Sequence, residues 1–155
     1  MKKFVAIFLV LVGILGTSVA AFAEETNDSI SPTAIGIGDT RETAITLFDN
    51  TLYDLYIQGN NDVDWYKWTN ATGKAVFFNA TIYPTAPGTQ LNMGVIIDYG
   101  NFESTFLPGQ KNEPTNGVII QGLYIPNGAS VFVKIGNSNS DTVQYRFNML
   151  ASGTD

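Results

Sequence analysis

From position 41 onward, the chain is a series of short apolar runs separated by turn residues, and none of these runs has the length or spacing of a long helix. The runs are rich in Val, Ile, Phe, Tyr and Thr, which favour the pleated, half-buried surface of a strand. Turn residues such as Asn60-Asn61-Asp62 and Pro126-Asn127-Gly128 separate them. This pattern predicts an all-β fold.

Eight segments are predicted to be strands: Ala44–Phe48, Leu52–Gln58, Asp64–Thr69, Lys74–Tyr83, Leu91–Asp98, Val118–Tyr124, Ser130–Ile135 and Val143–Leu150. In the seventh, Val131, Val133 and Ile135 share one face, and Phe132 and Lys134 share the other. Such alternation is expected where two sheets each bury one face. We therefore expect a jelly-roll-like β-sandwich of about eight antiparallel strands. Residues 102–117 are expected to form a long loop, with a brief strand at Ser104–Leu107.

The first 23 residues have the pattern of a secretory signal peptide. A basic start, Met1-Lys2-Lys3, precedes an apolar run from Phe4 to Gly16 and small residues that end in Ala21-Phe22-Ala23. The alternative is a retained membrane anchor, but a bilayer span needs about 20 apolar residues and this run is shorter. We predict cleavage after Ala23, a flexible acidic segment over 24–40 and one β-sandwich domain over 41–155. The predicted location is extracellular or cell-wall associated.

Composition excludes several kinds of function. The chain has no His and no Cys, so it cannot form a Ser-His-Asp triad, a thiol nucleophile, a disulfide or the usual zinc site. After residue 23, the 8 − 2 = 6 basic and 14 acidic residues give a formal charge of 6 − 14 = −8. This charge argues against nucleic acid or an anionic membrane as a partner. A metal ion that prefers oxygen ligands stays open.

One segment combines an acidic turn with an aromatic strand: Asn60-Asn61-Asp62-Val63-Asp64-Trp65-Tyr66-Lys67-Trp68. A period of two places Tyr66 and Trp68 on one face of the strand, and Trp65 and Lys67 on the other. The simplest interpretation is a tight turn whose Asn and Asp side chains accept hydrogen bonds from the backbone.

The order of the motifs indicates more than a turn. Glu25-Thr26-Asn27-Asp28-Ser29 comes first, then Arg41-Glu42-Thr43-Ala44-Ile45, then the Asp-x-Asp-Trp-Tyr turn, and finally Val131-Phe132-Val133-Lys134-Ile135 and Gln144-Tyr145-Arg146-Phe147. This layout resembles the bacterial pre-peptidase C-terminal domain, which is related to the collagen-binding domains of clostridial collagenases. The resemblance covers nearly all of the chain after the predicted signal. Each motif is short, so the specificity lies in their order and spacing.

The resemblance implies a non-catalytic β-sandwich attached to exported enzymes, and in several members of the family an acidic N-terminal segment and the Asp-rich turn together bind Ca²⁺. The matching residues here are Glu25, Asn27, Asp28, Asn61, Asp62 and Asp64. Ca²⁺ takes 6–8 oxygen ligands, which two such segments could supply. The chain departs from the calcium-binding members at Ala23, where they tend to have an acid. The alternative is a solvated tail and an ordinary turn.

Two classes of function fit this fold. The first is a binding module that recognises an extracellular protein or polysaccharide. A separately secreted protease is another possible partner, because members of the family usually follow a protease domain, whereas we expect this chain to be free-standing. Surface Tyr and Trp would make the contacts. The aromatic candidates are Tyr53, Tyr56, Trp65, Tyr83, Tyr99, Phe102 and Tyr124, of which Trp65, Tyr99 and Phe102 are the predicted ligand-contacting residues.

The second class is a small secreted glycosidase that uses paired carboxylates. Asp62 and Asp64 lie two residues apart on an extended segment, so their side chains would point the same way about 7 Å apart. We expect both to be solvated in a turn, where neither pKa would rise enough for a general acid. A pore-forming protein is a remote third option, because only Val143–Leu150 faintly suggests an amphipathic hairpin.

Overall fold

The computed structural model describes residues 38–113 and 115–153. The predicted signal peptide and nearly all of the predicted acidic segment therefore lie outside the described residues. The described chain contains one short 3₁₀ helix and ten strands. They are η1 (Arg41–Thr43), β1 (Ile45–Thr46), β2 (Thr51–Gln58), β3 (Val63–Thr69), β4 (Val76–Pro84), β5 (Leu91–Asp98), β6 (Leu107–Pro108), β7 (Gln110–Asn112), β8 (Gly117–Ile125), β9 (Ser130–Asn137) and β10 (Thr142–Gly153).

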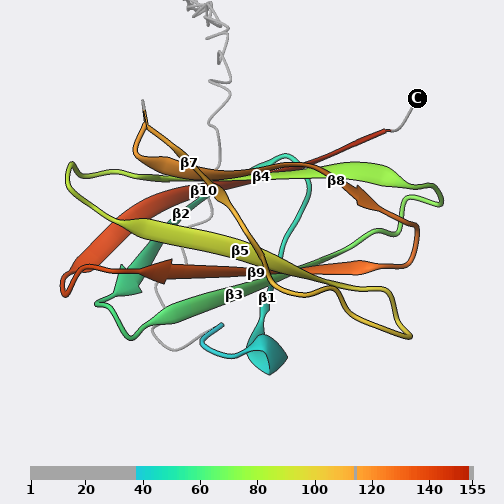
Figure 1. The fold of residues 1–155 in the computed structure, drawn as a ribbon, viewed down its shortest axis with the longest axis horizontal. Coiled ribbons are helices and arrows are strands. Elements are labelled where there is room, and N and C mark those ends of the chain that lie inside the picture. Colours follow the sequence, from blue (N-terminus) through green and yellow to red (C-terminus); the bar gives the residue numbers. More distant parts are fainter. Residues whose placement is uncertain (1–37, 114, 154–155) are drawn as a thin grey trace, which may run out of the picture.

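The strands form two stacked sheets of five, which appear as an upper and a lower layer in Figure 1. Sheet A has the order β2-β10-β4-β8-β7, and sheet B has the order β1-β3-β9-β5-β6. Consecutive strands belong to different sheets except for the pairs β5–β6 and β7–β8. The protein is thus a β-sandwich, and η1 lies under sheet B in the same view.

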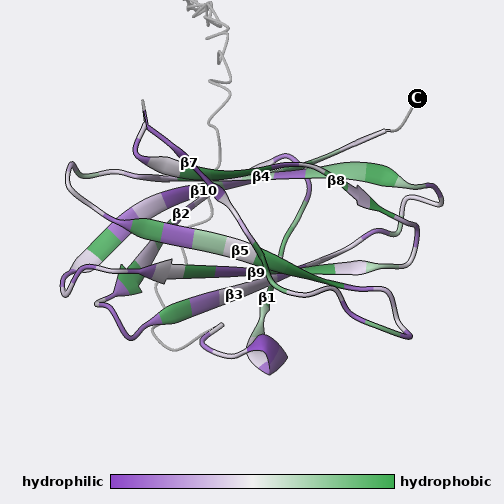
Figure 2. Cartoon of the chain, viewed as in Figure 1, coloured by the Kyte–Doolittle hydropathy of each residue, from purple (hydrophilic) through white to green (hydrophobic). Residues whose placement is uncertain are grey.

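Alternation of apolar and polar residues along the strands builds the core between the sheets. Hydrophobic and hydrophilic residues follow one another along several strands in Figure 2. Phe147 of β10 is fully buried, and its ring centroid lies 5.1 Å from that of Tyr66 on the opposite sheet. Trp68 and Phe78 also meet across the sandwich, with centroids 5.8 Å apart. Rings of this size supply much of the apolar area that holds two sheets together.

The fold class predicted from sequence is confirmed, and each of the eight predicted segments overlaps one of the observed strands. The expectation of purely antiparallel pairing was wrong, because β1 runs parallel to β3. The interpretation of 102–117 was wrong in detail: the short strands there are β6, which begins where the brief strand was expected to end, and β7, which was missed. In the part of the chain that the structure describes, no helix is long and apolar enough to span a membrane.

Candidate functional site

Three aspartates from two separate segments meet beside the first residues of β3. Asp39 precedes η1, Asp62 lies in the turn between β2 and β3, and Asp64 is the second residue of β3. One carboxylate oxygen from each lies within 4.8 Å of those from the other two. Asp39 is exposed, Asp62 is half-buried and Asp64 is buried.

Gly38 explains how Asp39 reaches this place. The carbonyl of Gly38 accepts a 2.6 Å hydrogen bond from the backbone N–H of Trp65, so the incoming chain lies against the edge of β3. Gly38 has φ +92°, and a Cβ there would lie 3.1 Å from the Trp65 carbonyl oxygen. Glycine suits both the left-handed backbone and the close approach.

Asp62 closes the turn between β2 and β3. Its Oδ2 accepts a 2.6 Å hydrogen bond from the backbone N–H of Gln58, and its Oδ1 accepts a 2.9 Å bond from the N–H of Val63. This confirms the simplest interpretation of the turn, in which an aspartate accepts hydrogen bonds from the nearby backbone.

Asp64 points into the sandwich, where it joins a hydrogen-bonded chain of two tyrosines. The Tyr145 hydroxyl on β10 donates a 2.6 Å bond to Asp64 Oδ2. The hydroxyls of Tyr145 and Tyr66 are also 2.6 Å apart. Only 7% of Asp64 is exposed, so its carboxylate depends on these protein donors in place of water.

Burial raises the pKa of Asp64 to about 6, and the hydrogen bond from Tyr145 opposes this rise only in part. The negative charges of Asp62 and Asp39 raise the same pKa further. Burial also raises the pKa of Tyr66 and of Tyr145, so both stay protonated and able to donate. At neutral pH, the three aspartates therefore bring negative charges together at a partly buried site. The ion pairs found among residues 38–113 and 115–153 lie elsewhere, at Arg41–Glu103 and Arg146–Asp54.

The structure brings together only some of the predicted metal ligands. Asp62 and Asp64 belong to the cluster, whereas Asn61 is an exposed turn residue. Glu25, Asn27 and Asp28 lie outside the described residues. Sequence reasoning missed Asp39, although it is the last acid of the predicted acidic segment.

One expectation about this aspartate pair was wrong. Asp64 is buried, not solvated. One carboxylate oxygen of each of the two residues lies within 4.8 Å of the other's, in keeping with side chains that point the same way.

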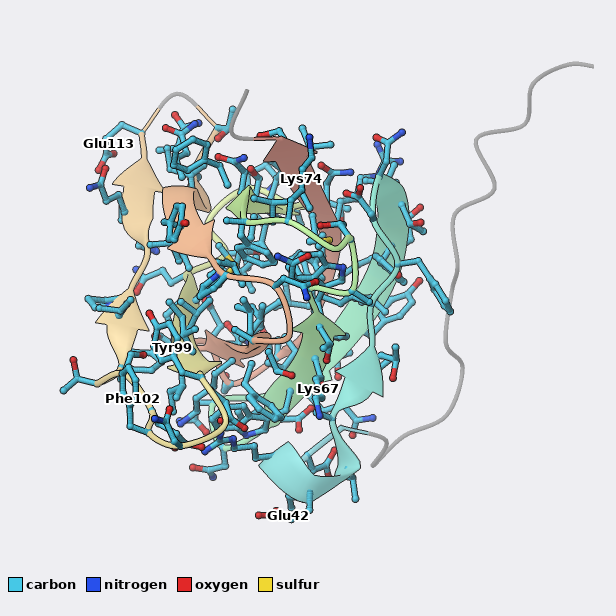
Figure 3. The ribbon with its side chains drawn as sticks, turned by 90° about the vertical axis from the view of Figure 1, so that its right-hand side faces the viewer. Glu42, Lys67, Lys74, Tyr99, Phe102 and Glu113 are labelled. Atoms are coloured by element: carbon cyan, nitrogen blue, oxygen red, sulfur yellow. The ribbon has the colours of Figure 1, made fainter. Side chains whose placement is uncertain are left out.

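The predicted ligand-contacting aromatics lie at two separate places: the loop after β5, and strand β3. Tyr99 and Phe102 stack in the loop after β5, with centroids 4.5 Å apart and planes at 17°, and Phe102 is 59% exposed. Trp65 is half-buried on β3, away from the loop after β5 that holds the other two. Figure 3 shows Tyr99 and Phe102 close together on one side of the molecule. Among the wider aromatic candidates, Tyr53 is buried in the core.

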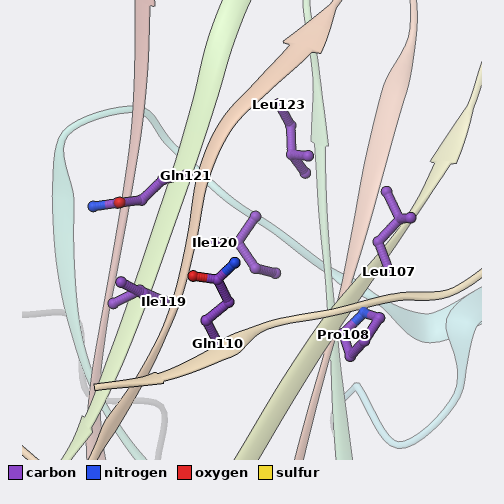
Figure 4. A pocket seen from close by; sticks show the side chains of 7 residues that line it. All are labelled: Leu107, Pro108, Gln110, Ile119, Ile120, Gln121 and Leu123. Atoms are coloured by element: carbon purple, nitrogen blue, oxygen red, sulfur yellow. The ribbon is translucent and has the colours of Figure 1, made fainter. Parts of the chain in front are cut away.

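Two hollows lie away from the aspartates. One of about 300 Å³ is lined mostly by apolar side chains of β6 and β8 (Figure 4): Leu107, Pro108, Gln110, Ile119, Ile120, Gln121 and Leu123. The other, of about 360 Å³, is lined by Thr46, Leu47, Phe48, Asp49, Lys67, Trp68 and Thr69. Neither includes Asp39, Asp62 or Asp64.

The sequence matches no protein-family model, and no curated protein matches it. Among solved structures, the chain is similar to the pre-peptidase C-terminal domain of collagenase from Bacillus anthracis, with a TM-score of 0.52 and 14% identity over 68% of this chain and 93% of that one. It also matches the Yersinia pseudotuberculosis-derived mitogen, with a TM-score of 0.49 and 19% identity over 70% and 90% of the two chains. A family 35 carbohydrate binding module from an environmental isolate matches with a TM-score of 0.35 and 12% identity over 71% and 84%. The first likeness confirms the resemblance seen in the sequence, at the level of the fold.

Proposed function

We propose that this protein is a secreted, non-catalytic binding module for an extracellular protein or polysaccharide, in which a calcium ion fastens the segment before η1 to β3. One observation carries the non-catalytic part. Both oxygens of Asp62 accept backbone hydrogen bonds, and Asp64 is buried with Oδ2 accepting from Tyr145. Both acids of the pair considered for catalysis thus already have structural partners.

The glycosidase alternative loses support from the same geometry. A glycosidase needs two carboxylates on opposite sides of a bound sugar, roughly 5–10 Å apart, with one pKa raised. The pKa of Asp64 is raised, but its side chain is buried between the sheets, where a sugar cannot reach it.

The donor set at the cluster fits a hard cation such as Ca²⁺. Asp39, Asp62 and Asp64 would each give a carboxylate oxygen, and the predicted ligands Glu25, Asn27 and Asp28 would add more from the N-terminal segment. Bound calcium would offset two of the three negative charges of the aspartates and hold the two segments together. Its role on this proposal is structural, because it would link Asp39, before η1, to Asp64 on β3.

Exposed aromatic side chains support the binding part of the proposal. Phe102 stacks on Tyr99 and presents more than half of its surface to solvent, which gives a ligand a flat apolar contact at low entropic cost. The signal-like first 23 residues support an extracellular setting. A separately secreted protease is a further candidate partner on this proposal.

A pull-down on insoluble collagen, chitin and peptidoglycan tests the proposal. We expect retention on at least one polymer, reduced for Phe102→Ala and unchanged for Phe48→Ala, whose ring is similarly exposed at 62% but lies elsewhere. Retention on none of the three, or hydrolysis of a chromogenic glycoside that Asp64→Asn abolishes, would contradict it.

A further inference from the structure

The outer face of sheet B carries two neighbouring rows of aligned residues. In the strand register, Trp65 of β3 lies opposite Lys134 of β9, and Lys134 lies opposite Gly94 of β5. The next row of the same face pairs Gly136 of β9 with Asn92 of β5. Both rows point away from the core, since the residues between them, Met93 and Ile135, are buried.

The two glycines allow side chains from elsewhere to lie on the sheet. At Gly94, an added Cβ would lie 2.1 Å from Cζ of Phe106, so the Phe106 ring occupies the space of a side chain there. At Gly136, an added Cβ would lie 2.6 Å from Oδ1 of Asn92. We call the set Trp65, Asn92, Phe106 and Lys134 the sheet B platform.

The platform has a positive charge on a protein whose net charge is −6. The Lys134 ammonium lies 5.6 Å from the centre of the Trp65 ring, and the Lys67 ammonium lies 5.2 Å from that of Phe132. In the described chain, the ion pairs involve Arg41 and Arg146 and leave these two lysines out. Figure 3 shows Lys67 on the sheet B side, whereas Lys74 and Glu113 lie on the sheet A side.

Part of this face is already covered, which limits where a ligand can lie. The guanidinium of Arg41 stacks 4.1 Å from the centre of the Phe132 ring and pairs with Glu103. Phe132 is accordingly only 8% exposed, whereas Phe106 is 48% exposed. The open part of the face is therefore the sheet B platform, with Lys67 in the neighbouring row.

We infer that the sheet B platform binds an acidic polysaccharide built of uronic acids. Trp65 and Phe106 would stack on the apolar faces of sugar rings, Asn92 would bond hydroxyls, and Lys134 would pair with a carboxylate. Trp65 and Gly94 are two strands apart, which is about 10 Å and comparable with the reach of a disaccharide unit. The inference rests on the proposed binding function and names its ligand class.

Isothermal titration with a short oligogalacturonate, beside a neutral cello-oligosaccharide of equal length, tests this inference on the secreted chain. We expect at least tenfold tighter binding of the uronate in low salt, and weakening as salt screens the charge. Lys134→Gln and Phe106→Ala should each weaken it about tenfold or more. The matched controls are Lys74→Gln, before β4, and Tyr124→Ala, on β8, which both lie on the sheet A side and should bind as the parent does. Ligand-induced change in Trp fluorescence should come from Trp65 and persist in a Trp68→Phe variant that is folded.

Three results would overturn the inference: no uronate binding, equal affinity for the neutral sugar, or equal losses in the platform and control variants. If the protein were retained on collagen, chitin or peptidoglycan but did not bind the uronate, this inference would fail and the binding-module proposal would stand. Binding of an acidic protein through the same lysines, without uronate binding, would also overturn it.

Discussion

The hydroxyl of Tyr145 on sheet A donates a 2.6 Å hydrogen bond to Asp64 on sheet B, so a buried polar contact joins the two layers of the sandwich. Tyr66 extends this contact through a 2.6 Å bond to the same hydroxyl. Such a buried network stabilises only when every member has a partner. No buried side-chain nitrogen or oxygen atom lacks a hydrogen-bond partner in the described part of the chain.

Removal of the Tyr145 hydroxyl should therefore destabilise the protein. Tyr145→Phe removes the donor to Asp64 Oδ2 and the hydroxyl that faces Tyr66, and we expect a loss of about 1–3 kcal/mol in the free energy of unfolding. Tyr56→Phe, at a ring that is 55% exposed, is the matched control and should change stability by less than about 0.5 kcal/mol. Urea unfolding at pH 7.5 measures both. Equal stability of Tyr145→Phe and the parent would show that the network does not stabilise the fold.

The raised pKa of Asp64 gives the metal-free protein an unusual pH dependence. The pKa rises from 3.8 to about 6 on folding, so the native state holds this proton more tightly than the unfolded chain. Well above pH 6, the ionised Asp64 lowers the free energy of unfolding by its full amount. This destabilisation is relieved as Asp64 takes up its proton, while the pH falls from about 7 toward 4. We expect metal-stripped protein to be more stable at pH 5 than at pH 7.5 by an amount on the order of 1–3 kcal/mol.

Asp64→Asn tests the origin of that pH dependence, because an amide keeps an acceptor for Tyr145 and has no charge to bury. The variant should be more stable than the parent at pH 7.5 without metal, and its stability should change little between pH 7.5 and 5. The free energy of unfolding is measured with denaturant at both pH values. If it changes with pH by the same amount in both proteins, another group causes the pH dependence.

Gly38→Ala should disturb the aspartate cluster without altering a carboxylate. The substitution adds a Cβ 3.1 Å from the Trp65 carbonyl oxygen at a backbone with φ +92°. We expect a loss of about 1–3 kcal/mol in stability from strain and a weaker effect of calcium, because Asp39 follows directly in the chain. Gly73→Ala is the control: it has φ +83° but nothing within 4 Å of the added Cβ, so it should leave the calcium effect unchanged. Thermal melts with and without calcium would show an unaltered calcium increment in Gly38→Ala if Asp39 does not matter.

The core should respond to truncation far more than the surface does. Phe147 is fully buried between Tyr53 and Tyr66, so Phe147→Ala should cost about 3–5 kcal/mol in the free energy of unfolding. Phe48→Ala, at an exposed ring, should cost less than about 0.5 kcal/mol. Chemical denaturation compares the two directly, and similar losses would mean that the packing of Phe147 is not as described.

Strand alternation predicted the fold because it records which face of each strand is buried. The inward positions of Tyr66 and Trp68 followed from a period of two. The same rule places Asp64 on their side, so its burial was readable from the sequence, although its position after a turn suggested solvation. The parallel pairing of β1 was not readable, because a strand of two residues has no period.

Asp39 could not be placed from local sequence, because its position depends on the tertiary path of the chain. The bond from Trp65 to the Gly38 carbonyl brings it to β3, and that contact spans many residues. The position of the Phe106 ring could not be predicted from local sequence either. Only the register of β5 and β9 shows that Gly94 leaves room for this ring. Both features depend on contacts that are distant in sequence.

A thermal melt of metal-stripped protein with and without millimolar Ca²⁺ tests the central claim, that Asp39, Asp62 and Asp64 hold a cation which ties the segment before η1 to the sandwich. A ligand that binds only the native state raises the melting temperature by mass action, and we expect a rise of about 3 °C or more. The rise should persist in Glu113→Gln, at an exposed acid in the turn after β7 on the sheet A side, and vanish in Asp39→Asn. A parent protein whose melting temperature does not change with calcium, or an Asp39→Asn variant that keeps the full rise, would contradict the claim.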